Sequence, residues 1–338
     1  MNIKKDFSLK NYNTFRTDAY ANYFVECETI DELKQVLKKS EFKEKSRLVI
    51  GGGSNLLFTS DYQGVVIYPN IKGIEKIKEN DSRVYIKAFC GENWDQFVEF
   101  CVDRNYGGVE NLSLIPGKVG AVPIQNIGAY GVEAKDSIVR IEALEIKSGR
   151  IKRFTKEECK FGYRDSIFKN VYKNKYIIIA VIFELSKNPE LVTDYGTITK
   201  ELSKYTQKNL KTIREIIIKI RKSKLPDPEE IGNAGSFFKN PVVNRKKFLE
   251  IKDNYPDMPF YTLSDNSIKI PAGWMIEECG WKGKHEGAVG VYEKQALILV
   301  NFGDASGKEI YELSQKIKSD VYNRFSILLE EEVEIIEN

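Results

Sequence analysis

The chain has 338 residues, 52 lysines and arginines, 49 aspartates and glutamates, and one histidine. A single histidine excludes a zinc site that needs two or three imidazoles, and a formal net charge of +3 gives no global field for nucleic acid. No G-x-S-x-G motif accompanies His285, which disfavours a serine-hydrolase triad. If the protein is an enzyme, we expect its chemistry to come from a cofactor and from acids other than histidine.

The first 70 residues alternate strand and helix patterns. A β-rich run at 23–27 precedes a capping box formed by Thr29 and Glu32, which predicts the start of a helix. Two short apolar runs, 47–50 and 65–67, predict strands. Together these patterns predict a small α/β unit.

The middle of the chain repeats this pattern around a long loop. Residues 84–88 alternate as a strand, and Asn93 can cap an amphipathic helix. Residues 106–131 lack periodicity and are rich in turn-formers, and strands resume at 138–146 and 176–185. We therefore expect a second α/β unit that carries an irregular loop.

A helix capped by Thr212 with Glu215 leads to the last part of the chain. The nine lysines and arginines between residues 200 and 224 indicate a solvated helix face. The prolines of 224–228 break the helix and are the best linker signal.

Beyond this linker the pattern predicts a third unit. It contains helices at 272–279 and from Ser306, where Glu309 completes a capping box, and a strand-like tail at 328–336. In that tail, alternation places Glu330, Glu332 and Glu334 on one exposed face.

The cysteines and the apolar runs indicate the compartment. Five cysteines are scattered without a C-x-x-C pair, so we expect free thiols in a reducing cytosol. The first residues lack the apolar stretch of a secretory signal, and no run approaches the roughly 18 apolar residues of a membrane helix. We expect a cytoplasmic protein of two or three domains, with no membrane and no nucleic-acid partner.

Two glycine-rich segments are candidates for ligand binding. Gly51–Asn55 follows a strand and exposes backbone N–H groups, although it lacks the last glycine of a dinucleotide fingerprint, so a structural turn and an anion site are equally open. Residues 116–131 hold four glycines, two prolines and no acid. That composition favours an ordered loop against a flat ligand, with Gln125 and Asn126 as directional hydrogen-bond donors or acceptors.

Three further segments have both a structural and a functional interpretation. Arg164 can form a surface ion pair with Asp165, or its aromatic neighbours can hold it for a carboxylate or phosphate. Ser236 follows a glycine and precedes two phenylalanines, which favours either an accessible hydroxyl or a turn residue. Residues 303–309 differ from a P-loop by one residue of spacing and favour a helix cap instead.

Taken together, these segments closely resemble the UDP-N-acetylenolpyruvoylglucosamine reductase family. The most specific match is the combination of Pro123–Gly131 with Gly232–Pro241. Tyr195-Gly196 is similar to a loop in the subclass with the longer middle domain. The remaining matching stretches follow the family's order and are 12–15, 51–55, 110–117, 161–169, 224–228, 272–274 and 329–333.

The resemblance implies an α+β fold of three domains. FAD would be held non-covalently between the first two domains, as in relatives of vanillyl-alcohol oxidase, and the third would cover the substrate. The implied division gives residues 1–70 to one FAD-binding subdomain, residues 71–222 and 331–338 to a second, and residues 223–330 to substrate binding. The protein is expected to be a monomer.

The resemblance also implies the reaction. NADPH would reduce FAD, and the flavin would pass the hydride to the enolpyruvyl ether of UDP-N-acetylglucosamine, giving UDP-N-acetylmuramate for peptidoglycan synthesis. Ser236 would donate the proton, while Arg164 and Glu332 would polarise the carboxylate, with no metal. The family often has Arg or Lys where this chain has Glu334, so the charge beside that carboxylate differs.

The resemblance carries further positions onto this sequence. Those implied for FAD are Gly51, Gly52, Gly53, Ser54, Asn55, Pro116, Gly117, Gly120, Pro123, Gln125, Asn126, Gly128, Ala129 and Gly131. Those implied for the substrate are Tyr130, Tyr163, Tyr195, Lys224, Asn240 and Gln295. Two alternatives stay open: another flavin oxidase or dehydrogenase on the same fold, and a sugar-nucleotide-binding module without catalysis.

Overall fold

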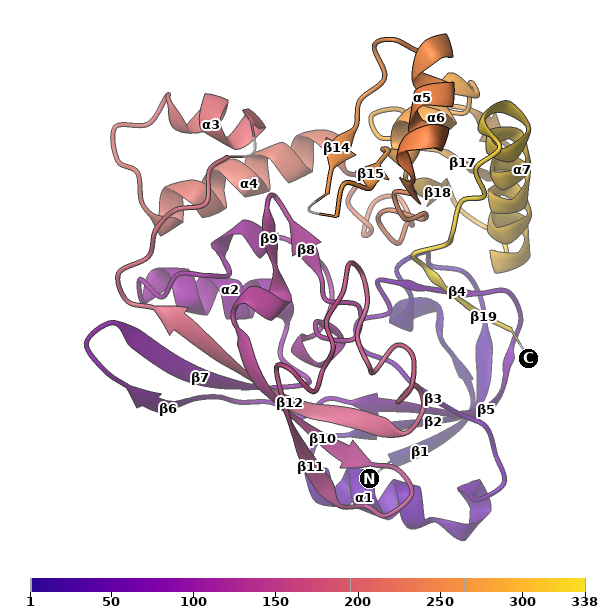
Figure 1. Ribbon diagram of the computed structural model, residues 1–338. Coiled ribbons are helices and arrows are strands. Elements are labelled where there is room, and N and C mark those ends of the chain that lie inside the picture. The colour runs from indigo at the N-terminus through magenta and orange to yellow at the C-terminus, as the bar shows by residue number, and fades with distance from the viewer. Residues whose placement is uncertain (1, 195, 264, 338) are drawn as a thin grey trace. The chain divides into compact units, whose positions relative to one another are not determined.

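The computed structural model describes residues 2–194, 196–263 and 265–337 (Figure 1). Helices and strands are mixed throughout, as the α+β prediction requires. The chain forms two compact units, each built from three stretches of sequence. Unit 1 comprises Met1–Phe7, Ala21–Gly52 and Gln63–Ser223, and unit 2 comprises Ser8–Tyr20, Gly53–Tyr62 and Lys224–Asn338. The boundary at Lys224 coincides with the predicted linker.

A four-stranded sheet in unit 1 contains the first predicted α/β elements. Its order is β1-β2-β5-β3, and β3 runs parallel to β5. Helix α1 begins at Thr29, whose hydroxyl accepts the Glu32 N–H at 3.1 Å, so the predicted helix start is confirmed. The bounds are β1 Asn2–Ser8, β2 Tyr20–Cys27, α1 Ile30–Lys38, β3 Arg47–Val49 and β5 Tyr62–Pro69.

A five-stranded antiparallel sheet forms the rest of the unit 1 framework. Its order is β11-β10-β12-β7-β6, and its central strand β12 is almost continuously apolar and buried. Helix α2 packs on this sheet through Trp94 and Phe97, whose ring centres lie 5.9 and 4.7 Å from that of Phe183. Figure 1 shows the positions of α2 and the strands in the backbone. The bounds are β6 Ile74–Glu79, β7 Arg83–Phe89, α2 Trp94–Asp103, β10 Ile138–Glu145, β11 Ile151–Thr155 and β12 Tyr176–Ser186.

The irregular segment and two helices complete unit 1. The long loop is ordered by short turns and a two-residue hairpin, as its composition predicts. Helix α4 begins at Leu210, two residues before Thr212, and the Asn209 side chain caps it by accepting the Thr212 N–H at 3.0 Å. The predicted Thr212 cap is therefore wrong. The bounds are β8 Gly128–Ala129, β9 Val132–Glu133, α3 Gly196–Leu202 and α4 Leu210–Lys224.

Unit 2 is a second core built around helix α7. The predicted capping box is present, because Ser306 accepts the Glu309 N–H and the Glu309 side chain accepts the Ser306 N–H. The buried side of α7 packs with Phe237 and Trp281. The bounds are β13 Val242–Val243, α5 Arg245–Asn254, β14 Tyr261–Thr262, β15 Ile268–Lys269, α6 Ala272–Glu278, β16 His285–Glu286, β17 Val289–Val291, β18 Leu299–Asn301 and α7 Gly307–Phe325.

The C-terminal tail is only partly the strand that the alternation predicts. Strand β19 spans Glu334–Ile336 and runs parallel to β4, Leu56–Phe58. Residues 327–333 alternate in burial but form only an isolated bridge, between Glu331 and Phe238. The tail therefore belongs to unit 2, whereas the predicted division grouped 331–338 with 71–222. The three-domain division itself stays a prediction.

The Asp95 carboxylate joins α2 to α4 in unit 1. Arg214 donates to it from both terminal nitrogens at 2.6 and 2.9 Å, and the Leu114 N–H donates as well. The Arg214 side chain is only 10% exposed and the Asp95 side chain only 26%. Burial raises the pKa of Asp95, but the hydrogen bonds from Arg214 and Leu114 outweigh burial and hold that pKa below its ordinary value.

We expect Asp95→Asn to lower the free energy of unfolding by about 2–3 kcal/mol at neutral pH, because it leaves Arg214 with only the more exposed Glu99 carboxylate, at 3.6 Å, as a counter-charge. The folded-state pKa of Asp95 is depressed, so this stabilisation is complete above the unfolded pKa and disappears as the pH falls through the folded pKa. Urea unfolding from neutral to strongly acidic pH measures the difference.

The matched control is Asp103→Asn. Asp103 and Lys211 also join α2 to α4, at 3.4 Å, but their side chains are 56% and 63% exposed. Such exposed pairs contribute about 1 kcal/mol or less. Equal losses in the two variants at neutral pH would contradict the interpretation of Asp95.

Candidate functional site

The two glycine-rich segments touch each other in unit 1. A Cβ at Gly52 would lie 2.8 Å from the Cα of Gly117, and one at Gly120 would lie 2.6 Å from the Cβ of Cys90. Atoms at these separations clash, so only glycine allows the backbones to approach. The contact brings together two of the segments that the sequence predicted for ligand binding, with no side chain between Gly52 and Gly117.

The second half of the first glycine turn belongs to unit 2. Gly53 has a φ of +65°, and a Cβ there would lie 1.9 Å from the Tyr12 carbonyl oxygen. Asn55 donates from its side chain to the Glu332 carbonyl at 3.0 Å, and its own carbonyl accepts the Glu334 N–H at 2.9 Å. The turn therefore ends directly beside the tail that carries Glu332.

The Asn126 side chain organises the long loop from inside. It is fully buried, donates to the Gly162 carbonyl at 2.9 Å and to Glu133 at 3.2 Å, and accepts the Lys135 N–H at 3.0 Å. Its amide is thus committed to the protein, and a part for Asn126 in FAD binding stays a prediction that rests on its backbone. Gln125 is partly exposed.

Arg164 contacts the same loop. Its Nη2 donates to the Gly128 carbonyl at 2.8 Å, and its guanidinium lies 5.4 Å from the centre of the Tyr163 ring. Arg164 itself has a left-handed φ of 53°. The neighbouring Asp165 accepts hydrogen bonds from the Asn170 side chain and the Ser166 N–H. The guanidinium is therefore held against strand β8 of the hairpin whose turn contains Tyr130.

Ser236 lies in unit 2 on an extended segment between two others. It forms a bridge with Ile298, and the Phe237 N–H donates to the Leu297 carbonyl at 2.8 Å. On the other side, the Phe237 carbonyl accepts the Glu332 N–H at 2.8 Å. Backbone pairing thus places Ser236 and Glu332 on neighbouring segments, with Ser236 exposed and Glu332 half-buried. Arg164 belongs to unit 1.

The positions predicted for the substrate fall in both units. In unit 2, Asn240 accepts the Ala272 N–H at 2.9 Å, Gln295 lies beside Gly273, and Lys224 is exposed at the end of α4. In unit 1, Tyr163 is 38% exposed. Tyr195 lies outside the described residues.

Two residues that hold Tyr130 were not predicted. Asn111 is fully buried and donates to the Tyr130 carbonyl at 2.9 Å and the Val192 carbonyl at 3.0 Å. Arg221 donates to the Leu114 carbonyl at 3.2 Å and interacts with the Tyr130 hydroxyl. Burial lowers the pKa of Arg221. The basic composition of α4 gave no signal for Arg221, because a solvated lysine-rich face has the same pattern.

Comparison with known proteins shows which family the chain belongs to. The family model of an FAD binding domain matches residues 21–155. The family model of the C-terminal domain of UDP-N-acetylenolpyruvoylglucosamine reductase matches residues 227–336. A reductase of that name from Flavobacterium johnsoniae is 47% identical over 339 residues, covering 99% of this chain and 100% of the relative. The chain belongs to the UDP-N-acetylenolpyruvoylglucosamine reductase family.

Further relatives agree with this assignment. The reductase of the same name from Bacteroides fragilis is 47% identical over 334 residues, covering 99% of this chain and 100% of the relative. A crystal structure of such a reductase from Thermus caldophilus superposes with a TM-score of 0.69 at 23% identity, covering 100% of both chains, which shows a shared fold. The predicted family and α+β fold are confirmed, and membership makes the chain an oxidoreductase with an FAD-binding domain.

The residues of unit 1 fit such a cofactor. The FAD binding domain match includes Gly52 and Gly120, where the absence of a side chain lets the two glycine segments pack closely, and Gly117, whose backbone meets Gly52. Successive bare N–H groups of this kind bind phosphate oxygens. Within the part of the chain that the structure describes, no cluster of acids, histidines and cysteines could hold a metal ion, and no helix is long and apolar enough to cross a bilayer.

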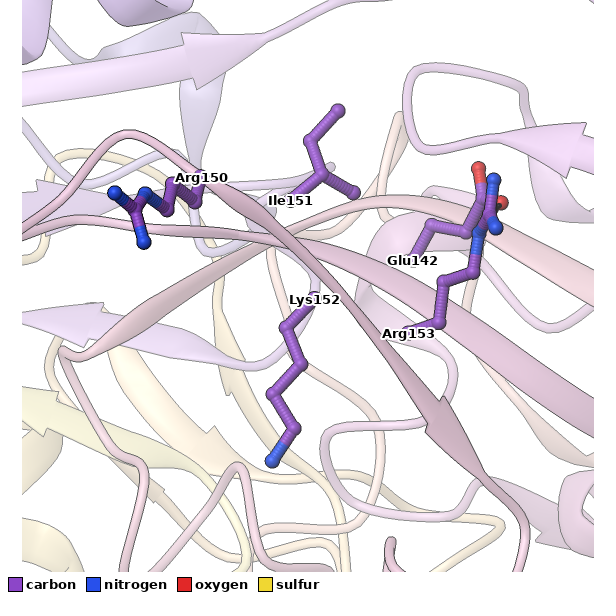
Figure 2. Close-up of a pocket in the computed structure, with 5 residues that line it drawn as sticks. All are labelled: Glu142, Arg150, Ile151, Lys152 and Arg153. Carbon is purple, nitrogen blue, oxygen red and sulfur yellow. Dashed lines mark hydrogen bonds and ion pairs between the residues drawn. The ribbon is translucent and has the colours of Figure 1, made fainter.

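A shallow hollow elsewhere in unit 1 lies over β10 and β11 and is lined by Glu142 and residues 150–153. Figure 2 shows the Arg153 guanidinium beside the Glu142 carboxylate, while Arg150 and Lys152 point away from it. Glu142 also pairs with Lys87 at 2.8 Å. Because two cations neutralise the acid of this hollow and no predicted site residue lines it, it is not the candidate site.

The glycine contact generates a prediction about cofactor binding. Gly52→Ala places a methyl group 2.8 Å from the Gly117 Cα, so the two loops must separate. Overpacking of this kind costs about 1–3 kcal/mol, which corresponds to a loss of about tenfold or more in FAD affinity. Fluorescence titration of the flavin measures that affinity.

Gly196→Ala is the control. Nothing lies within 4 Å of a Cβ at Gly196, and its φ is not in the left-handed range, so this variant should bind FAD like the wild type. The melting temperature of each variant without flavin separates loss of the site from general unfolding. Undiminished FAD affinity in Gly52→Ala would show that the glycine contact is not part of the site.

Proposed function

We propose that the protein uses NADPH and FAD to reduce UDP-N-acetylglucosamine enolpyruvate to UDP-N-acetylmuramate in peptidoglycan precursor synthesis. The observation that carries this proposal is the end-to-end match with reductases of that name at 47% identity. The proposal includes the catalytic roles that the resemblance implies for Arg164, Ser236 and Glu332.

The residues proposed to hold FAD are those of the two glycine segments, from Gly51 to Asn55 and from Pro116 to Gly131. When bound, FAD supplies hydride chemistry, accepting a hydride from NADPH and giving it to the terminal carbon of the enolpyruvyl group. The protein must then stabilise the negative charge that develops on the adjacent carbon, and it must provide a proton there.

Ser236 is the proposed proton donor. Its side chain is exposed, and Gly235 before it has a φ of +70° with open space where a Cβ would stand. Backbone bonds of Phe237 to Leu297 and to Glu332 fix the segment on both sides. A positioned acid of this kind contributes about 10²–10⁴-fold in rate.

Arg164 and Glu332 are proposed to act on the substrate carboxylate. The bond from Arg164 to the Gly128 carbonyl holds the guanidinium in one orientation, and a fixed planar fork suits a planar carboxylate. One preorganised donor aimed at developing charge is worth about 2.7–4 kcal/mol. Glu332 can assist only if it shares a proton with the anion, because two carboxylates otherwise repel.

The proposed contacts with the UDP-sugar come from side chains of different chemistry. The Lys224 ammonium suits the diphosphate, and the Asn240 amide can donate from its nitrogen because its oxygen already accepts the Ala272 N–H. Arg221 and Asn111 hold Tyr130 at its hydroxyl and its carbonyl. The other residues in this set are Tyr163, Tyr195 and Gln295.

The decisive experiment separates the two half-reactions of Ser236→Ala in a rapid-mixing instrument. NADPH should still bleach the flavin at the wild-type rate, because hydride transfer to FAD needs no proton from Ser236. Reoxidation of the reduced flavin by the enolpyruvyl substrate should slow by about 10²-fold or more. Absorbance of the oxidised flavin follows both steps.

Ser60→Ala is a suitable control, because Ser60 is an exposed serine of the same unit. It should leave both half-reactions unchanged. Normal reoxidation in Ser236→Ala would remove Ser236 from the proton-donor role. A purified wild-type protein that binds UDP but no flavin would overturn the whole proposal in favour of a binding module.

The single histidine generates a second prediction. His285 is exposed on strand β16, and its ring stacks on that of Phe302 at 4.2 Å. It occupies no position proposed for catalysis, so His285→Ala should keep turnover within about twofold of the wild type, the range of surface substitutions. A steady-state assay of NADPH consumption measures this. A loss comparable to that of Ser236→Ala would mean that the reaction uses an imidazole.

A further inference from the structure

Lys118 lies on the glycine contact in unit 1. It follows Gly117, and its Cβ and Cγ are 3.6 and 3.9 Å from the position that a Cβ on Gly51 would take. Its backbone forms a bridge with Asn93, and the Val119 N–H donates to the Glu92 carbonyl at 2.9 Å. The lysine stem therefore runs along the face of the first glycine turn.

A second lysine approaches from another segment of the same unit. The Lys72 ammonium donates to the Gly91 carbonyl. Gly91 packs closely against the backbone of residues 70 and 71, since a Cβ on Gly91 would lie 2.5 Å from the carbonyl carbon of Asn70 and 2.7 Å from the nitrogen of Ile71. The Lys72 and Lys118 side chains interact with each other.

The charges around this pair are not balanced. Burial, followed by the charge of Lys72, lowers the pKa of Lys118 to about 8, and the more distant Glu92 and Glu26 oppose the shift only in part. Glu92 accepts the Gly73 N–H at 2.6 Å, and Glu26 accepts the Asn70 amide at 2.8 Å. Among the described residues, neither lysine has a carboxylate within the ion-pair distance of 4.0 Å.

We propose that Lys118 and Lys72 form an anion site for the diphosphate of FAD, beside the backbone of Gly51, Gly52 and Gly117. This inference rests on the proposed function, and it adds two charged side chains to a set of positions that otherwise carries no charge. An ammonium group binds phosphate as a point charge, and an anion between two lysines replaces repulsion with attraction. The diphosphates of NADPH and the UDP-sugar have the same chemistry.

The position of the pair favours FAD over these other sources. Both lysines lie within residues 21–155, which match the FAD binding domain. Lys118 is one residue from Gly117, whose backbone meets Gly52. The lysine proposed for the UDP diphosphate, Lys224, belongs to unit 2.

The first test needs no variant. The full chain freed of flavin is titrated with FAD in a calorimeter near pH 8, in buffers that differ in ionisation heat. Because a diphosphate favours the charged form of Lys118, binding should take up a fraction of a proton at this pH and almost none at pH 6. The Cys90 thiol beside the site stays neutral here, since burial raises its pKa to about 12. Equal proton uptake at both pH values would overturn the proposal.

The second test compares FAD with riboflavin, which lacks the diphosphate. Lys118→Ser should weaken FAD binding by about tenfold or more and leave riboflavin binding unchanged. Lys118→Arg should restore most of the FAD affinity, because it keeps the charge. Lys147→Ser, which removes an exposed lysine of unit 1, is the matched control and should bind both ligands like the wild type.

The outcomes distinguish this inference from the proposed function. Full FAD affinity in Lys118→Ser overturns the diphosphate site while leaving the reductase proposal intact. Loss of NADP⁺ or UDP affinity with unchanged FAD affinity also overturns it, because the pair would then serve another diphosphate. If the wild-type chain bound neither FAD nor riboflavin, that result would contradict the proposed function itself.

Discussion

The contact between Gly52 and Gly117 is the constraint on which the candidate cofactor site depends. Two chain segments about 65 residues apart meet backbone to backbone, so closely that a Cβ on Gly52 would lie 2.8 Å from the Gly117 Cα and clash with it. In the same unit, Asp95 accepts hydrogen bonds from Arg214 and from the Leu114 N–H, so the ion pair that joins α2 to α4 also anchors the chain just before the second glycine segment.

Much of the fold could be predicted from local signals. The sequence predicted the helix starts capped by Thr29 and Ser306 and the helix end at Lys224. These could be predicted because a capping residue or a proline acts on its immediate neighbours in the chain. The start of α4 could not be predicted, because Asn209 and Thr212 can both cap a helix and the Thr212 hydroxyl instead donates to a nearby carbonyl. The choice depends on packing, which the local pattern does not contain.

For the candidate site, the sequence predicted only those residues that belong to family motifs. Family motifs placed Ser236 and Glu332 in the sequence, but their proximity comes from backbone bonds through Phe237 that no periodicity reveals. The interpretation of Asn126 as a ligand group did not foresee that its amide binds the loop that carries it. Arg221 was hidden in a basic run, because a buried arginine and a solvated one look alike until the helix is placed against its neighbours.

The parallel pairing of β4 with β19 has a consequence for the order in which the chain can fold. Hydrogen bonds of Asn55 and Thr59 reach across 277 residues to the tail. During synthesis, unit 1 has all its segments once residue 223 has emerged, whereas the core of unit 2 lacks a strand until residues 334–336 follow. Contacts so distant in sequence form slowly. Strand β4, which is synthesised early, thus lacks its partner strand β19 until almost the whole chain has been made.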